Sequence, residues 1–385
     1  MSARRRVCVV TGSRAEYGLL RWVIDGLRHT RGIELQLAVT GAHLEAAFGA
    51  TVAAIKADGY PIAARVPMRL KDDTPAGIAR SMALGLAGFG AAFARLRPQL
   101  VVVLGDRYEI LAAAQAALLA NIPIAHIAGG DLTEGAYDDA MRHALTKMSH
   151  LHFVTNPASG RRVVQMGEDP RRVHVVGSPG LDNLKRLKLL GRAALERALG
   201  ARLRARNLLV TFHPVTLAPQ DSGAQLDELL HALDALGAET GIFFTLPNAD
   251  GGGRALRRKI ERFVARHANA RAFASLGQLR YLSLMREVDA VVGNSSSGLY
   301  EAPALRKPSV NIGERQKGRL RAASVIDAAP RRKAIGAAIR RALALDTRRA
   351  RTPYGDGNAA RRIVKVIAGA GDFAPLLHKR FHPAP

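Results

Sequence analysis

Five polar segments of this chain each follow directly on an apolar run, and their residues are of types that bind anions or transfer protons. They lie at 12–18, 105–109, 128–131, 211–214 and 293–298. In a parallel α/β sheet, ligands bind beyond the carboxyl ends of the strands. If the apolar runs are strands, we expect these segments to line one cleft between two lobes.

The segment Gly293–Gly298 is the clearest candidate anion site, with the sequence Gly-Asn-Ser-Ser-Ser-Gly. Small residues at a strand-to-helix turn let backbone N–H groups approach phosphate oxygens, and the helix N-terminus adds a favourable dipole. Ser295 and Ser296 offer hydroxyls, and Glu301 would lie in the following helix, where its carboxylate could accept from ribose hydroxyls. An ordinary serine helix cap explains the same pattern. The chain has neither a Walker motif nor a G-x-G-x-x-G fingerprint, which argues against ATP hydrolysis and dinucleotide redox chemistry.

The segment from Asp131 to His150 is the densest in polar residues. Helical spacing would place Asp138 and Arg142 on one face, and would pair Asp139 with His143. Carboxylates beside a cation suit proton transfer, although a solvated helix face with routine ion pairs fits the same spacing. We predict no catalytic metal, because His126, His143, His150, His152 and His213 form no H-x-x-x-H or H-E-x-x-H pattern.

Composition limits the classes of function. The formal net charge is +25, but its basic residues are scattered, and neither an RNA-binding motif nor a zinc finger accompanies them, so we expect no nucleic-acid partner. No apolar run reaches the roughly 18 residues of a membrane span. The basic N-terminus leads into Val7–Thr11, which we interpret as a first strand rather than a signal peptide, so we expect a cytoplasmic protein. Cys8 is the single cysteine and is expected to be a buried core residue.

Strands and helices are predicted to alternate through the whole chain, as in a doubly wound α/β fold. The strand runs are nearly all apolar, as parallel strands covered on both faces require. The expected strands are Arg6–Thr11, Glu34–Thr40, Leu100–Leu104, Ile122–Ile127, Leu151–Thr155 and Val173–Val176, then Asn207–Phe212, Ile242–Leu246, Ala290–Val292 and Ser309–Ile312. The expected helices are Ala15–Leu27, Ala76–Leu96, Glu109–Ala120, Asp138–Ser149, Leu226–Leu236, Ala255–His267 and Ala359–Ala368. The alternation restarts after about residue 185, which indicates a second α/β lobe.

Seven polar motifs stand in a fixed order along the chain. They are Gly12-Ser13-Arg14-Ala15-Glu16-Tyr17-Gly18, Gly105-Asp106-Arg107-Tyr108-Glu109, Gly129-Gly130-Asp131-Leu132-Thr133-Glu134-Gly135, Asp138-Asp139-Ala140-Met141-Arg142-His143, Thr211-Phe212-His213-Pro214, Asn294-Ser295-Ser296-Ser297-Gly298 and Asn311-Ile312-Gly313-Glu314-Arg315-Gln316. In this order they resemble the motifs of the hydrolysing UDP-N-acetylglucosamine 2-epimerases, and the resemblance covers roughly residues 6–370.

The resemblance implies a GT-B fold of two Rossmann-like, doubly wound domains facing a central cleft. The N-terminal domain would span 1–180 and carry the sugar side, the UDP-binding domain would span 181–357, and a helix and tail at 358–385 would return to the first domain. The implied catalytic residues are Asp106, Asp131, Asp138, Arg142 and His143. The implied substrate- and UDP-binding residues are Arg14, Glu16, His213, Asn294, Ser295, Ser296, Ser297, Gly298 and Glu301.

The chemistry implied by the resemblance begins with loss of the C2 proton and of UDP, which gives a 2-acetamidoglucal. Water then adds, and C2 is reprotonated from the opposite face. No metal or other cofactor is needed, and a homodimer or homotetramer is compatible with this interpretation. Two departures stand out: Asp131 occupies a position that is often Glu, and Asp138-Asp139 replaces a common Asp-Glu pair.

Two UDP-sugars fit as substrate. UDP-N-acetylglucosamine would give N-acetylmannosamine for sialic acid-type synthesis, and it is the one that we favour from the sequence. A UDP-2,4-diacetamido-2,4,6-trideoxy-glucose would give a precursor of legionaminic-type sugars. A GT-B glycosyltransferase is the alternative from another class, and a non-enzymatic anion-binding module is a third. The cluster Asp131–Asp138 argues against the transferase, which needs one base.

Overall fold

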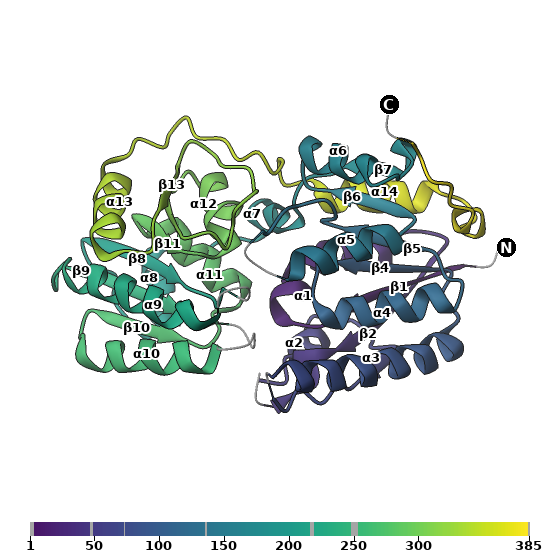
Figure 1. Cartoon of the computed structure of the whole chain (residues 1–385), viewed down its shortest axis with the longest axis horizontal. Coiled ribbons are helices and arrows are strands. Elements are labelled where there is room, and N and C mark those ends of the chain that lie inside the picture. The colour runs from purple at the N-terminus through teal and green to yellow at the C-terminus, as the bar shows by residue number, and fades with distance from the viewer. Residues whose placement is uncertain are drawn as a thin grey trace. The chain divides into compact units, whose positions relative to one another are not determined.

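The computed structural model describes residues 4–46, 49–72, 74–134, 137–215, 219–247 and 253–383. By its internal contacts the chain divides into two compact units (Figure 1). Unit 1 comprises Met1–Asp131, Asp138–Asp182 and Tyr354–Pro385, and unit 2 comprises Leu132–Tyr137 and Asn183–Pro353. The short excursion 132–137 into unit 2 is a feature that the sequence did not indicate.

Unit 1 is built on a seven-stranded parallel sheet in the order β3-β2-β1-β4-β5-β6-β7. The order reverses beside β1, so the strands β1 and β4 form the switch point at which doubly wound sheets place ligands. The strands are β1 (Arg5–Thr11), β2 (Ile33–Thr40), β3 (Ala64–Val66), β4 (Leu100–Leu104), β5 (Ile124–Ile127), β6 (Leu151–Val154) and β7 (Val173–Val175).

Helices cover both faces of this sheet, which explains why β1 is apolar at every central position. Val7 and Val9 belong to the core formed with α1 and α14, whereas Cys8 and Val10 belong to the core formed with α3 and α4. Successive strand residues point to opposite faces, so an unbroken apolar run fills both cores. The helices are α1 (Arg14–Arg28), α2 (Val52–Ala57), α3 (Pro75–Leu96), α4 (Tyr108–Leu119), α5 (Asp138–Met148), α6 (Pro157–Gln165) and α14 (Ala359–Gly369). The short α7 (Asp182–Arg186) begins with Asp182 of unit 1 and continues in unit 2.

The C-terminal segment belongs to unit 1. Both oxygens of the buried Asp182 carboxylate accept hydrogen bonds from the N-terminus of α14, from the Ala359 N–H at 2.8 Å and the Ala360 N–H at 2.6 Å. The helix then packs against α1, with Ile363 and Ile367 in the same core as Val7. This satisfies backbone donors that a helix end otherwise leaves unpaired.

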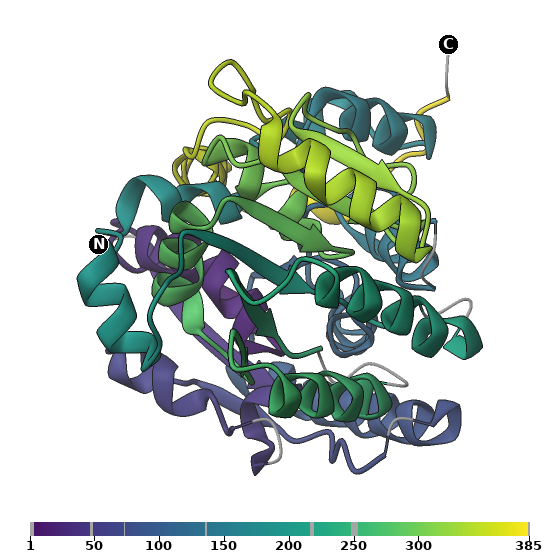
Figure 2. The ribbon, with the colours of Figure 1, turned by 90° about the vertical axis from the view of Figure 1, so that its left-hand side faces the viewer.

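Unit 2 repeats the plan with a six-stranded parallel sheet in the order β10-β9-β8-β11-β12-β13. On one face lie α9, α10 and α13, seen in green to yellow-green in Figure 2, and on the other lie α8, α11 and α12. The strands are β8 (Arg206–Thr211), β9 (Thr240–Thr245), β10 (Ala270–Phe273), β11 (Ala290–Gly293), β12 (Ser309–Ile312) and β13 (Val325–Ala328). The helices are α8 (Arg192–Leu199), α9 (Pro219–Asp234), α10 (Gly253–Arg266), α11 (Gly277–Glu287), α12 (Glu301–Ala304) and α13 (Arg332–Ala344).

The helix α3 corrects one expectation from the sequence. It is 22 residues long, and an 18-residue window with a mean hydropathy of 1.3 makes it long and apolar enough to cross a membrane by length and composition. Its buried side includes Gly85, Phe89 and Phe93, which pack in the core that β1 and α4 share. One such helix is weak evidence for a membrane, because core helices pass the same test.

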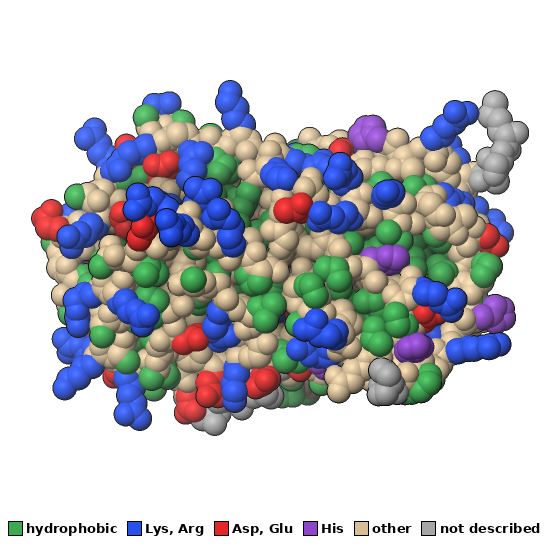
Figure 3. Space-filling view, turned by 90° about the horizontal axis from the view of Figure 1, so that it is seen from above, with side chains coloured by type: hydrophobic (Ala, Val, Ile, Leu, Met, Phe, Trp, Pro, Cys, Tyr) green, Lys and Arg blue, Asp and Glu red, His purple; other side chains and the backbone are tan. Residues whose placement is uncertain are grey.

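The basic side chains are spread over the surface of both units. Figure 3 shows Lys and Arg over most of the visible face, with Asp and Glu interspersed. Many of the cations have an acidic partner, as in Arg348–Asp346 at 2.8 Å and Arg171–Asp169 at 2.7 Å. Such exposed pairs contribute little to stability.

Candidate active site

Arg142 is the centre of the polar cluster in unit 1. Its guanidinium is almost fully buried, with 2% of the side chain exposed. It forms an ion pair with Asp106, at the end of β4, and a second with Asp139 at 3.2 Å. It also donates to the backbone oxygen of Asp131 at 2.8 Å. A buried cation therefore joins the segments after β4 and β5 to the first turn of α5, and three of the predicted residues, Asp106, Asp131 and Arg142, come together.

Asp131 is held by its neighbours more tightly than its predicted catalytic role suggests. Its side-chain oxygen Oδ1 accepts from the hydroxyls of Thr155 at 2.7 Å and Ser159 at 2.6 Å, and the residue is buried. An acceptor with two such donors is fixed in orientation. Asp138 is the first residue of α5, beside Asp139, which pairs with His143 at 3.3 Å as the helical spacing predicted. Gly135 and Ala136, in the same polar segment, lie outside the described residues.

Glu16 and Glu109 form a second buried group of carboxylates, at the ends of β1 and β4. Glu16 accepts from the Gly12 N–H at 3.0 Å, and Glu109 pairs with Arg107 at 3.2 Å. Burial raises the pKa of Glu16 to about 8, and the nearby Glu109 adds to the shift, whereas the Gly12 N–H opposes it. Glu16 is therefore largely protonated at neutral pH. Arg14, the other predicted ligand here, is the first residue of α1.

The buried histidines of unit 1 contact groups that hold the fold together. His126 Nε2 lies 2.7 Å from the Gly105 oxygen, and burial lowers the pKa of His126 to about 4. His152 contacts Glu168 at 3.0 Å. Within the described part of the chain, no three His, Cys, Asp or Glu side chains are grouped so as to hold a metal ion.

In unit 2 the site is built mainly from backbone held by amide side chains. The Asn294 side chain is completely buried and binds both sides of His213: its oxygen accepts from the His213 N–H at 2.7 Å, and its nitrogen donates to the His213 oxygen at 2.8 Å. Gly293 has φ +137, and a Cβ there would lie 1.9 Å from the Thr211 oxygen, so only glycine fits. Asn294 therefore locks the ends of β8 and β11 together.

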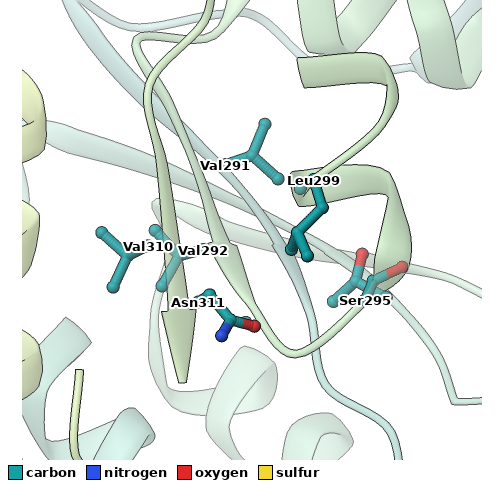
Figure 4. A pocket seen from close by; sticks show the side chains of 9 residues that line it. Val291, Val292, Ser295, Leu299, Val310 and Asn311 are labelled. Carbon is teal, nitrogen blue, oxygen red and sulfur yellow. The ribbon is translucent and has the colours of Figure 1, made fainter. Parts of the chain in front are cut away.

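The serines form a 3₁₀ turn rather than the start of a long helix. Ser295 caps this turn, Ser296–Gly298, by accepting from the Ser297 N–H at 3.4 Å, and the following α12 has four residues. Pro303 lies inside α12 and cannot continue its hydrogen bonding. The expected helix dipole is thus reduced to that of a short turn. A cavity of about 10 Å³ under the turn, lined in part by Val291, Val292 and Val310 (Figure 4), has room for about one water molecule.

Glu301 begins α12 and is buried. Burial raises the pKa of Glu301 to about 7, while its own backbone N–H and the positive charge of Arg319 oppose the shift. A carboxyl group with this pKa changes charge near neutrality. Tyr281 is a nearby residue that the sequence did not single out, and its hydroxyl interacts with Ser297 and Thr211.

The sequence also gave no role to the connection that follows β12. Gln316 is buried and donates from its side-chain Nε2 to the backbone oxygen of Asn294 at 2.9 Å. Arg315 Nη1 reaches the same oxygen at 3.3 Å. The signal was present, because Asn311–Gln316 was one of the family motifs, but a motif alone does not say what its side chains contact.

Comparison with known proteins agrees with this geometry. The model of the UDP-N-acetylglucosamine 2-epimerase family matches residues 25–368. A GDP/UDP-N,N'-diacetylbacillosamine 2-epimerase (hydrolyzing) from Campylobacter jejuni is 39% identical over 84% of both chains. The UDP-N,N'-diacetylbacillosamine 2-epimerase (hydrolyzing) of Legionella pneumophila is 35% identical over 97% of this chain and 98% of its own. A polysialic acid biosynthesis protein of Escherichia coli is 40% identical over 86% of this chain and 84% of its own.

The fold is similar to that of solved epimerases. The UDP-GlcNAc 2-epimerase of Neisseria meningitidis, solved bound to UDP-GlcNAc, superposes with a TM-score of 0.78 at 17% identity, and the match covers 94% of this chain and 99% of that one. The two parallel sheets are those of the GT-B fold predicted from the sequence. With the family model matching most of the chain, this protein belongs to the UDP-N-acetylglucosamine 2-epimerase family of nucleotide-sugar enzymes.

Proposed function

We propose that this protein is a hydrolysing 2-epimerase, which releases UDP and the free 2-epimer of an N-acetylated sugar. The observation that carries the proposal is the cluster of carboxylates around the buried Arg142, in a chain whose relatives at 35–39% identity are named hydrolysing 2-epimerases. The reaction needs a base that removes the C2 proton and an acid that returns one. Carboxylates at a partly buried site serve both roles.

Asp106 and Asp138 are proposed to carry the proton transfers. Asp106 is oriented by Arg142 and keeps 22% of its side chain exposed. Asp138 is the first residue of α5 and is partly exposed. Asp131, by contrast, has its Oδ1 engaged by the hydroxyls of Thr155 and Ser159, so it serves mainly to hold the segment in place.

The nucleotide is proposed to bind to unit 2. Backbone N–H groups and the hydroxyls of Ser295, Ser296 and Ser297 would donate to the diphosphate, together with His213. Glu301 would accept from the ribose hydroxyls. Neutral donors and cations stabilise the charge that builds on departing UDP. Glu16 is largely uncharged at pH 7 because of its pKa of about 8, so it would not repel the diphosphate.

A glycosyltransferase is disfavoured by the same cluster. Transfer of the sugar to an acceptor requires a single base, whereas this unit holds the carboxylates of Asp106 and Asp139 on one arginine, which also binds the backbone oxygen of Asp131. Incubation with the UDP-sugar in deuterated water separates the two reactions. We expect a free sugar with deuterium at C2, whereas a sugar that remains on UDP, or lacks C2 deuterium, contradicts the proposal.

For the sugar, we propose UDP-N,N'-diacetylbacillosamine, the substrate in the names of the Campylobacter and Legionella relatives. This reverses the preference drawn from sequence motifs, which favoured UDP-N-acetylglucosamine. The latter stays the second candidate because the Escherichia coli relative is a polysialic acid biosynthesis protein. The two substrates differ at C4 and C6, so kcat/KM measured for both by NMR of the products decides between them. Equal or higher kcat/KM with UDP-N-acetylglucosamine overturns this choice.

A further inference from the structure

The connection between β12 and β13 contacts two segments that are far apart in the sequence. At one end the side chain of Gln316 donates to the backbone oxygen of Asn294, next to the serine turn. At the other end Arg319 Nε donates to the Leu132 oxygen at 2.9 Å, and Arg319 Nη2 donates to the Thr133 hydroxyl at 2.9 Å. Residues 313–319 therefore join the proposed nucleotide loop to the stretch that follows Asp131.

Residues 132–134 fit this connection closely. The Glu134 N–H donates to the Lys317 oxygen at 3.4 Å, and the two side chains form an ion pair at 3.5 Å. Gly318 has φ +84, and a Cβ at this position would lie 2.7 Å from Leu132 Cβ. Thr133 is buried. The fit thus combines hydrogen bonds, an ion pair and a close approach that only glycine allows.

Arg319 also contacts residues close to the proposed nucleotide site. Its guanidinium lies 5.5 Å from the centroid of the Tyr300 ring, and its charge acts on Glu301. A planar guanidinium can stack on an aromatic face and still donate at its edge. Arg319 therefore contacts the residue next to the proposed ribose ligand and the backbone next to Asp131.

The position of residues 132–134 affects the carboxylates because of chain connectivity. The chain leaves unit 1 after Asp131, forms part of unit 2 at 132–137, and returns to unit 1 at Asp138. Asp131 is anchored by Thr155 and Ser159, and Asp138 is the first residue of α5. Leu132 follows Asp131 directly and Asp138 comes four residues after Glu134, so the position of residues 132–134 constrains both carboxylates through the chain.

We propose that Arg319 is a positioning residue for the epimerase reaction. It holds residues 132–134 in place, and so constrains the segment that follows Asp131 and leads to Asp138, the carboxylate proposed to transfer a proton. This inference rests on the proposed function, because it needs Asp138 to act on the substrate. It adds a role for a residue that does not touch the reacting atoms.

The variant Arg319→Gln tests this. We expect kcat to fall about tenfold or more, while the Kd for UDP, measured by calorimetry, changes less than about threefold, because the serine turn is held by Gln316 and Asn294 instead. Arg319→Lys should recover part of kcat, since it keeps the charge and one donor. The control Arg348→Gln removes an exposed cation and should leave both constants unchanged. Unchanged kcat in Arg319→Gln, or a loss of UDP affinity as large as the loss of kcat, overturns the proposal.

The single variant Thr133→Val keeps the test valid if Arg319→Gln folds poorly, and a double-mutant cycle sharpens the test if it folds well. Thr133→Val removes the hydroxyl acceptor at nearly constant shape, so kcat should fall several-fold with UDP affinity kept. The double variant should be no slower than Arg319→Gln alone, since both remove one contact. Multiplied effects on kcat contradict the coupling. A wild-type protein that is inactive on both UDP-sugars refutes the proposed function instead, which distinguishes the two failures.

Discussion

The two units hold their functional residues in different ways. In unit 1 the side chains hold one another through charge, as the buried Arg142 does with Asp106 and Asp139. In unit 2 neutral amide side chains hold backbone, as Asn294 does on His213 and Gln316 does on Asn294. A charged cluster can exchange protons, whereas a backbone cradle presents fixed dipoles to an anion.

This difference indicates how the work is divided. The nucleotide is the part of the proposed substrate that does not react, and a backbone cradle would bind it without titrating. The sugar is the part that exchanges a proton, and it needs groups that titrate. Glu301 is the exception within unit 2, because the pKa of this carboxyl, about 7, lets it change charge near neutrality. The predictions below test the division, from the largest expected effect to the smallest.

Asp106→Asn and Asp138→Asn should have the largest effects. Each amide keeps the shape of the carboxylate but is a very poor proton acceptor, so kcat should fall by about 10²-fold or more. The Kd for UDP should change little, because the proposed nucleotide site is built from unit 2. Steady-state kinetics and calorimetry measure the two constants separately.

The variants Asp106→Asn and Asp138→Asn also distinguish a structural role from a chemical one. Asp106→Asn weakens an ion pair of the buried Arg142, so its thermal unfolding should be followed in parallel. If Asp138→Asn turns over normally, Asp138 belongs to the surface of α5 and the proposed role is wrong. If both variants lose UDP binding, the division between the units is wrong.

Glu301→Ala should weaken UDP binding about tenfold, because a charge-assisted hydrogen bond to the ribose is lost. The chemical step should be affected much less, so kcat at saturating substrate stays within a few-fold. Calorimetry with UDP measures the loss of UDP affinity, and steady-state kinetics measure kcat. A Glu301→Ala variant that binds UDP normally removes Glu301 from the nucleotide site.

The pH dependence of UDP binding should follow Glu301. The pKa of this carboxyl is about 7, so the charged acceptor is lost as the pH falls below 7, and UDP affinity should fall with it. UDP itself also titrates in this range, so Glu301→Gln is the matched control and should lack the part of the slope that comes from the protein. Identical pH profiles for the two proteins contradict the assignment.

Glu16 should affect stability rather than proton transfer. Its folded pKa of about 8 lies above the ordinary glutamate pKa of 4.5, so between these values the folded state binds more protons and stability falls as the pH rises. From pH 6 to pH 7 the loss should be about 1 kcal/mol relative to Glu16→Gln. Urea unfolding of both proteins at the two pH values measures it. Parallel stability curves would show that Glu16 is charged in the folded state.

Much of the fold was predictable because it follows from local sequence patterns. Runs such as 100–104 fill two cores at once, and this apolar pattern predicted most of the parallel strands. The strands β3, β10 and β13 were missed because a charged residue interrupts the apolar run of each: Arg65, Arg271 and Asp327. The pairing of Asp139 with His143 followed from helical spacing. The ion pair between Arg142 and Asp106, 36 residues apart, and the contact of Arg319 with residues 132–133 could not be predicted, because no local rule relates such distant positions.

Cys8→Ala should have the smallest effect, and it tests whether unit 1 acts through its carboxylates alone. Cys8 lies on β1, close in sequence to the turn that carries Gly12, but its side chain is completely buried in the core beside Val10 and Phe89. Burial raises the pKa of the thiol to about 12, so the nucleophilic thiolate is absent at neutral pH. Removing the sulfur should lower stability by about 1 kcal/mol and change kcat less than about twofold, since the carboxylates keep their partners. The measurement is kcat before and after treatment with a thiol reagent, for wild type and variant. Inactivation of the wild type while Cys8→Ala is spared would place the thiol within reach of the site and contradict the division between the units.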